Sequence, residues 1–149
     1  MVVVLDSGLV SLATNPNRDN PDANRCNEWL ERLIAGGVEV VLPEIVDYEL
    51  RRELVRANKL EGLRRLDAFG EAVTYLPLSS AAMRRAADLW AAARNAGRPT
   101  ADDKAIDVDV ILAAQALIKD GEGLVIATTN VGHLSRYAPA KLWHDIYLA

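Results

Sequence analysis

Short apolar runs alternate with helix-like segments along the whole chain, and this alternation limits the possible folds more than any other feature of the sequence. Runs rich in Val, Leu and Ile suit strands that are buried on both faces. The segments between them can form crossover helices, so the pattern predicts βαβ units and a mostly parallel sheet. The predicted strands are residues 2–5, 38–42, 73–76 and 124–127, with a weaker fifth at 142–148.

Turn and capping residues mark the helices between these strands. A turn-rich stretch at 15–20 leads into the first of them, which Gly36 and Gly37 end. Pro43 suits the first turn of the next helix, and Gly70 is expected to break the one after that. The predicted helices are residues 21–35, 43–57, 60–69, about 80–97, and a last one opened by Asp107 or Asp109.

The size and charge of the chain suit one globular domain, residues 1–149, with a formal charge of -4. This charge gives no overall attraction to nucleic acid, so an RNA contact would need a local basic face. One cysteine, Cys26, cannot form an internal disulfide, and with only His133 and His144 a clustered zinc site is not expected. The apolar start is too short for a membrane span, so we expect a cytoplasmic protein with no membrane segment.

Acidic residues recur where the predicted fold would bring them to one edge of the sheet. Asp6 directly follows the first strand, and Glu49 lies on the inward face of the helix after the second. Asp107 and Asp109 precede an apolar helix. Ligands bind off the carboxyl ends of parallel strands, and convergent carboxylates bind hard cations. The sequence therefore predicts a cation site among these acids.

Each acid also has a simpler structural interpretation. Asp107 or Asp109 could cap a helix N-terminus, and Glu49 could be a surface acid paired with Arg52 or Arg56. The Thr-Thr-Asn stretch after the fourth strand could be a polar turn. The sequence leaves these alternatives open, although Asp6 is the acid that a purely structural role explains least well.

Four segments of the chain form a recognisable series: VVVLDSGLVSL with Asp6, LPEIVDYELRREL with Glu49, DVDVILAAQAL with Asp109, and LVIATTNVGHL with Asn130. These segments resemble motifs of the PIN-domain ribonucleases, and in particular of the VapC-type toxins of toxin–antitoxin pairs. The likeness covers essentially the whole chain, and the four motifs occur in the family's order. Each motif alone is weak, but the four together are fairly specific.

This resemblance implies an α/β fold, a three-layer α/β/α sandwich with a mostly parallel five-stranded sheet in the order 3-2-1-4-5. It also implies a hydrolase, an endoribonuclease that depends on Mg²⁺ or Mn²⁺ and uses Asp6, Glu49 and Asp109. Asp107 is expected to be a further ligand or an outer acceptor, because Mg²⁺ takes few carboxylates directly. With no His or Lys general base apparent, the ion must generate the nucleophile.

The remaining members of the site are expected around these acids. Ser7, Thr128 and Asn130 could orient waters or touch phosphate, and Arg52 and Lys104 are the basic residues expected to hold RNA. The resemblance also implies two protein partners, a small antitoxin and a second copy of the chain in a homodimer.

Two positions depart from the family's pattern. Asn130 is neutral where many members carry a fourth carboxylate, and Gly8 stands where a polar residue is common. A neutral residue should weaken the binding of a second ion. It also leaves an alternative function open, a catalytically inactive PIN-like binding or scaffold module.

Overall fold

The computed structural model describes residues 1–97, 103–119 and 121–148, and of residues 103–106 only the backbone. Its strands form one sheet in the order β3-β2-β1-β4-β5, and every pairing is parallel. The predicted sheet and strand order are confirmed. The strands are β1 (Val2–Leu5), β2 (Glu39–Pro43), β3 (Thr74–Leu76), β4 (Leu124–Thr128) and β5 (Ala140–Leu142).

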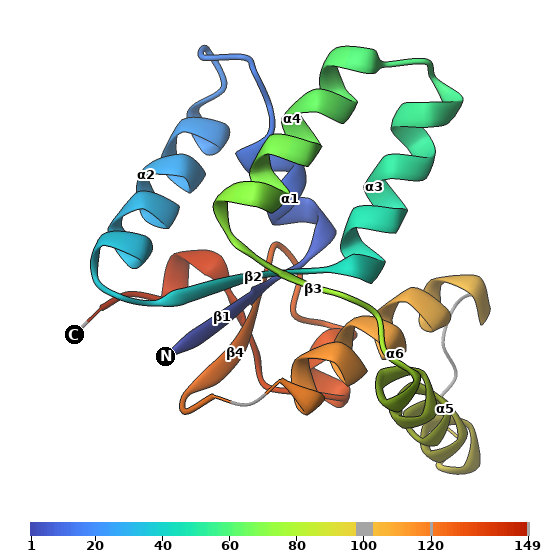
Figure 1. Ribbon diagram of the computed structural model, residues 1–149. Coiled ribbons are helices and arrows are strands. Elements are labelled where there is room, and N and C mark those ends of the chain that lie inside the picture. Colours follow the sequence, from blue (N-terminus) through green and yellow to red (C-terminus); the bar gives the residue numbers. More distant parts are fainter. Residues whose placement is uncertain (98–102, 120, 149) are drawn as a thin grey trace.

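Helices cover both faces of this sheet and give the predicted three layers. Figure 1 shows α1 to α4 on one side, with α6 on the other side and α5 packed beside it. The helices are α1 (Ser7–Ala13), α2 (Pro21–Ala35), α3 (Glu44–Arg56), α4 (Leu60–Ala72), α5 (Ser80–Asn95) and α6 (Asp103–Ile118), with short 3₁₀ turns at Leu134–Arg136 and Trp143–Asp145.

The central strand, β1, is buried between β2 and β4, so the polar residues at its carboxyl end lie in the middle of one edge of the sheet. All of β1 is buried, and Val3 pairs with Val40 on β2 and with Val125 on β4. Burying such a side chain contributes roughly 1.5–3 kcal/mol. Because the three strands are parallel, their carboxyl ends meet at one edge, and the chain delivers Asp6, the start of α3 and Thr128 there.

The prediction for the last strand is wrong. The strand runs over Ala140–Leu142 instead of residues 142–148. Two of the apolar residues that follow, Trp143 and Ile146, are buried in another way. Trp143 turns inward and packs edge-on against Trp29, with ring centroids 5.5 Å apart. The Trp29 Nε1–H then donates to the carbonyl of Ile146 at 2.7 Å. This packing requires a helical turn directly after Leu142.

The start of α6 also differs from the prediction. The helix begins at Asp103, so neither Asp107 nor Asp109 opens it or caps it. Asp107 and Asp109 therefore lie in the second turn, inside the helix.

Two further helices depart from the sequence pattern. Helix α1, which Asp6 caps, is not predicted at all. Helix α4 continues through Gly70 to Ala72, so Gly70 does not break it. At Gly70 the helix faces Tyr75 and Leu42 at ordinary packing distances, and contact with the sheet outweighs the weak helix preference of glycine.

None of the helices in the described part of the chain combines the length and apolar character needed to cross a membrane.

Candidate functional site

Asp6 forms the centre of the candidate site. Its Oδ1 accepts from the Leu9 N–H at 3.0 Å, which makes it the N-cap of α1. Its Oδ2 accepts a hydrogen bond from the Thr128 hydroxyl at the end of β4. Burial raises the pKa of the Asp6 carboxyl, and hydrogen bonds from Thr128 and from backbone N–H groups oppose that rise. The carboxylate is therefore fixed in place, although its capping role alone would not require burial.

Glu49 approaches Asp6 from α3. Its side chain is half-buried and bonds to the Ser7 hydroxyl on α1. Burial raises the pKa of the Glu49 carboxyl; the Arg52 guanidinium and the Ser7 bond lower it, and the charge of Asp6 raises it further. Glu49 thus lies within electrostatic reach of Asp6, as the helical wheel predicts, and Ser7 orients it.

Asp109 joins them from α6 on the other face of the sheet. Burial raises the pKa of its carboxyl, as do the charges of Glu49 and Asp6, whereas His133 lowers it. Three carboxylates from three elements therefore affect one another's protonation. Like charges gathered in a partly buried place are unfavourable without a cation nearby.

The donors of this cluster suit a hard cation. Carboxylates and hydroxyls offer only oxygen, the ligand that Mg²⁺, Mn²⁺ and Ca²⁺ prefer. Among the described residues, no three His, Cys, Asp or Glu side chains already lie close enough together to enclose an ion. Asp6, Glu49 and Asp109 are the residues that would hold a cation here.

Asp107 is placed differently from Asp109. It is exposed, and two residues of helix separate the two side chains by roughly 200° around α6. The structure does not bring Asp107 together with the other three acids.

Thr128, the last residue of β4, and Asn130 in the turn after it are held by hydrogen bonds of that turn. Thr128 is buried, and its Oγ accepts from the Asn130 N–H at 3.0 Å while donating to Asp6. The Asn130 amide oxygen accepts from the Gly132 N–H at 3.0 Å. Thr128 thus supports Asp6 and is not exposed to a phosphate, and Asn130 folds back on its own turn, as Asn commonly does.

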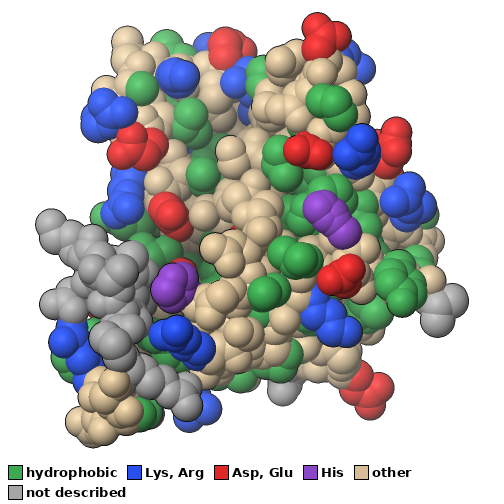
Figure 2. Space-filling view, turned by 180° about the vertical axis from the view of Figure 1, so that it is seen from behind, with side chains coloured by type: hydrophobic (Ala, Val, Ile, Leu, Met, Phe, Trp, Pro, Cys, Tyr) green, Lys and Arg blue, Asp and Glu red, His purple; other side chains and the backbone are tan. Residues whose placement is uncertain are grey.

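Of the basic residues expected near the site, Arg52 lies within electrostatic reach of Glu49. The side chain of Lys104 falls outside the described residues. On the face shown in Figure 2, the described basic side chains are scattered and alternate with acidic ones, without forming one continuous patch.

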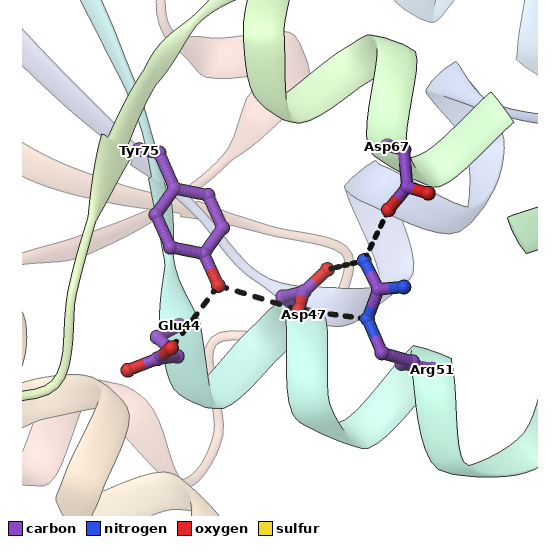
Figure 3. Close-up of polar contacts among 5 residues, drawn as sticks. All are labelled: Glu44, Asp47, Arg51, Asp67 and Tyr75. Carbon is purple, nitrogen blue, oxygen red and sulfur yellow. Dashed lines mark hydrogen bonds and ion pairs between the residues drawn. The ribbon is translucent and has the colours of Figure 1, made fainter. Parts of the chain in front are cut away.

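Arg51 is not available for phosphate binding. It forms a two-pronged ion pair with Asp47 at 3.1 and 3.0 Å and a second pair with Asp67 on α4 (Figure 3). The Tyr75 hydroxyl lies 3.3 Å from the same Asp47 and 3.4 Å from Glu44. This polar network fixes α3 to α4 and to β3, on the side of α3 away from Glu49.

The sequence pattern misses two residues beside the acids, His133 and Tyr48. His133 has no evident partner in the sequence, yet it acts electrostatically on Asp109. Tyr48 is 54% exposed next to Glu49, and the Arg52 guanidinium carbon lies 5.3 Å from its ring centroid. A Cβ at Gly8 would lie 2.6 Å from the Thr129 hydroxyl, which explains the small residue there. Of these residues, only His133 could have been expected at the site from the sequence, because it follows β4 closely in the chain.

We expect Asp109→Asn to stabilise the metal-free protein at neutral pH, because it removes one of three clustered charges. The melting temperature should rise by a few degrees, or on the order of 1 kcal/mol. Because the pKa of Asp109 is raised in the folded protein, the fold is most stable when Asp109 is protonated. The free energy of unfolding therefore falls as the pH rises through that pKa. The gain should therefore vanish in acid.

The measurement is thermal unfolding of both proteins in EDTA at several pH values. Asp22→Asn is the matched control, because Asp22 is an exposed acid in a surface ion pair with Arg25. A loss of stability in Asp109→Asn at neutral pH would show that Asp109 is not crowded by like charges.

Comparison with known proteins gives the family. The model of the PIN domain family matches residues 3–138. This is well over half of the chain, so the chain belongs to the PIN domain family, whose members are generally nucleases. A search of curated proteins found no match.

Several solved structures share this fold. VapBC2 from Rickettsia felis, bound to a DNA fragment from their promoter, matches with a TM-score of 0.72 and 18% identity over 96% of this chain and 99% of that one. FitAcB from Neisseria gonorrhoeae matches with a TM-score of 0.68 and 22% identity, over 97% of this chain and 99% of that one. VapBC-1 from nontypeable Haemophilus influenzae matches with a TM-score of 0.68 and 18% identity, over 97% of this chain and 100% of that one. At these identities the likeness concerns the fold.

Proposed function

We propose that this PIN-domain protein is a metal-dependent endoribonuclease that acts as the toxin of a toxin–antitoxin pair. The observation that carries the proposal is the gathering of Asp6, Glu49 and Asp109 from three separate elements at the carboxyl edge of the sheet. Burying three acids side by side costs stability, and a cation that the acids hold explains why the fold keeps them together.

In this proposal the three carboxylates hold one Mg²⁺ or Mn²⁺ ion. An ion held there would supply an activated water and neutralise charge on the scissile phosphate. Asp6 is kept in position by Leu9 and Thr128, and Glu49 by Ser7. Such supporting hydrogen bonds orient ligands and sharpen the geometry of a metal site.

Tyr48 and Arg52 support single-stranded RNA as the substrate. An exposed aromatic ring with a guanidinium beside it offers a surface on which an unpaired base can stack, and the positive charge attracts phosphate. Both side chains lie next to Glu49 on α3, so a base bound there would place its backbone near the acids.

We therefore expect Tyr48→Ala to weaken binding of single-stranded RNA. Loss of one stacked base costs roughly 1–3 kcal/mol, a factor of about 5 to 150 in affinity. The measurement is the dissociation constant of a labelled oligonucleotide with the Asp6→Asn background, which prevents cleavage. Tyr147→Ala is the matched control, because Tyr147 is also exposed, at 74%, but lies near the chain's C-terminal end. Equal weakening by both variants would exclude a specific role for Tyr48.

An antitoxin partner is proposed from the resemblance to the VapC-type toxins and from the fold shared with VapBC2 and VapBC-1. A hollow of about 250 Å³ between α1, α3 and α4 could receive a partner segment. Its lining includes the apolar Leu50, Leu54 and Leu66 and the basic Arg56 and Lys59. A basic side chain of the partner that reaches Asp6 would replace the cation electrostatically, so inhibition should weaken as the Mg²⁺ concentration is raised.

A homodimer is proposed on the resemblance alone.

A substrate comparison tests the proposed activity. The purified protein is incubated with mixed pools of single-stranded RNA and of DNA of the same sequences, with Mn²⁺ present. Internal cleavage of the RNA pool alone supports an endoribonuclease. Cleavage of both pools would show a nuclease of broader substrate range, and binding of RNA without cleavage would favour the inactive module.

A further inference from the structure

Gln115 is a fully buried amide in an otherwise apolar stretch of α6. Its neighbours Leu112, Ala113, Ala114 and Ala116 are also buried. An unpaired amide in such a place costs roughly 1–3 kcal/mol. Gln115 avoids this cost because both ends of its amide are hydrogen-bonded, and both partners are backbone groups of other elements.

The acceptor end of this amide serves the N-terminus of α3. The first turn of a helix leaves its N–H groups without partners inside the helix. The N-cap residue here is Pro43, which has no side-chain acceptor, and the Glu44 carboxylate accepts from the Leu78 N–H instead. The Gln115 Oε1 accepts from the Ile45 N–H at 3.1 Å. A residue of α6 therefore caps α3.

The donor end ties the same helix to the sheet. The Gln115 Nε2 donates to the carbonyl of Leu76, the last residue of β3, at 3.0 Å. Leu76 pairs with Pro43, the residue directly before α3. One amide thus joins α6 to two adjoining points of the backbone at the carboxyl edge of the sheet.

Both helices that meet at Gln115 carry acids of the candidate site. Glu49 lies four residues, about one turn, after Ile45 on α3, and Asp109 lies six residues before Gln115 on α6. The network of Asp47 and Arg51 already fixes the opposite side of α3 (Figure 3). The hydrogen bond from Ile45 to Gln115 links α6 directly to the first turn of α3, the helix that carries Glu49.

We propose that Gln115 is a positioning residue of the metal site, which holds α6 against the first turn of α3 and so sets the separation of Asp109 and Glu49. This inference rests on the function proposed above. Without the tie, the two like charges would move apart, and a cation would have to draw the helices together again before both acids could bind it. Part of the binding free energy would then be lost.

Gln115→Met tests this, because methionine has a similar shape and no amide. The Mn²⁺ concentration at half-maximal RNA cleavage should rise about 10-fold, in the range known for residues that support metal ligands. The rate at saturating Mn²⁺ should fall less, since the bound ion restores the geometry. Calorimetric titration with Mn²⁺ should show the same shift in binding without any substrate.

Two further variants separate positioning from general destabilisation. Trp29→Phe removes a buried hydrogen bond to Ile146, far from α3 and α6, and should leave the Mn²⁺ midpoint unchanged. Gln115→Glu, protonated when buried, can keep both hydrogen bonds and should recover most of the affinity. If Gln115→Met does not fold, Gln115→Asn, too short to reach both partners, replaces it with the same expectation.

The outcomes distinguish this inference from the proposed function. A midpoint that rises in Gln115→Met and not in Trp29→Phe supports positioning by Gln115. The inference is overturned if Gln115→Met has the wild-type Mn²⁺ midpoint, or if the midpoint rises equally in Gln115→Met and Trp29→Phe. A wild-type protein that binds Mn²⁺ but does not cleave RNA contradicts the proposed activity, while the calorimetric comparison still decides the role of Gln115. A wild-type protein that binds no Mn²⁺ overturns both.

Discussion

Asp6→Asn should lower RNA cleavage by roughly 100-fold or more while leaving the fold intact, because it removes the charge that holds the cation. Asparagine is as good an N-cap as aspartate, and its amide oxygen can still accept from the Leu9 N–H, the bond that begins α1. The variant therefore separates the structural role of Asp6 from its chemical role.

The measurement is the initial cleavage rate of a single-stranded RNA at saturating Mn²⁺, together with the melting temperature of each protein. Asp22→Asn, on the exposed surface of α2, is the control for loss of one negative charge. Cleavage by Asp6→Asn at the wild-type rate would mean that the catalytic centre lies elsewhere.

Arg51→Ala should destabilise the protein by roughly 2 kcal/mol, because it leaves the Asp47 carboxylate without its charged partner. The Asp47 side chain is only 10% exposed, and removing one member of a buried pair costs about 3–5 kcal/mol. The expected value is lower because Arg51 is itself 37% exposed and because the Tyr75 hydroxyl still contacts Asp47. Activity at saturating metal should change little.

Urea unfolding at neutral pH measures this effect. The matched control is Arg64→Ala: Arg64 pairs with Glu61 on the surface of α4, and both side chains are more than two-thirds exposed. Exposed pairs of this kind contribute about 0–1 kcal/mol. If the two variants lose the same small amount, the network in Figure 3 is not a structural tie.

The parts of the fold that the sequence predicts are those set by local pattern. The boundaries of β1 to β4 lie within one residue of the predicted ones, because buried parallel strands are uniformly apolar and the turns around them are well marked. The position of Asp6 follows directly from β1. The inward direction of Glu49 follows from helical periodicity, and in the structure Glu49 is partly buried and lies within electrostatic reach of Asp6.

The parts that the sequence does not predict depend on contacts between distant segments. The prediction places the last strand at the wrong residues because Trp143 packs on Trp29, more than one hundred residues away in the chain. His133 acts on Asp109 across a loop, and the hydrogen bonds of Gln115 join α6 to two other elements. No local pattern contains such pairings, because in each case the partner is chosen by the tertiary fold.

The dependence of RNA cleavage on a divalent cation tests the central claim most directly. The protein is first stripped with EDTA and then titrated with Mn²⁺ or Mg²⁺ in the presence of a single-stranded RNA, beside Asp6→Asn. We predict no cleavage in EDTA, full recovery of wild-type cleavage as the metal is restored, and no recovery in Asp6→Asn. Cleavage that persists in EDTA, or that Asp6→Asn performs equally well, would contradict a metal site built from Asp6, Glu49 and Asp109.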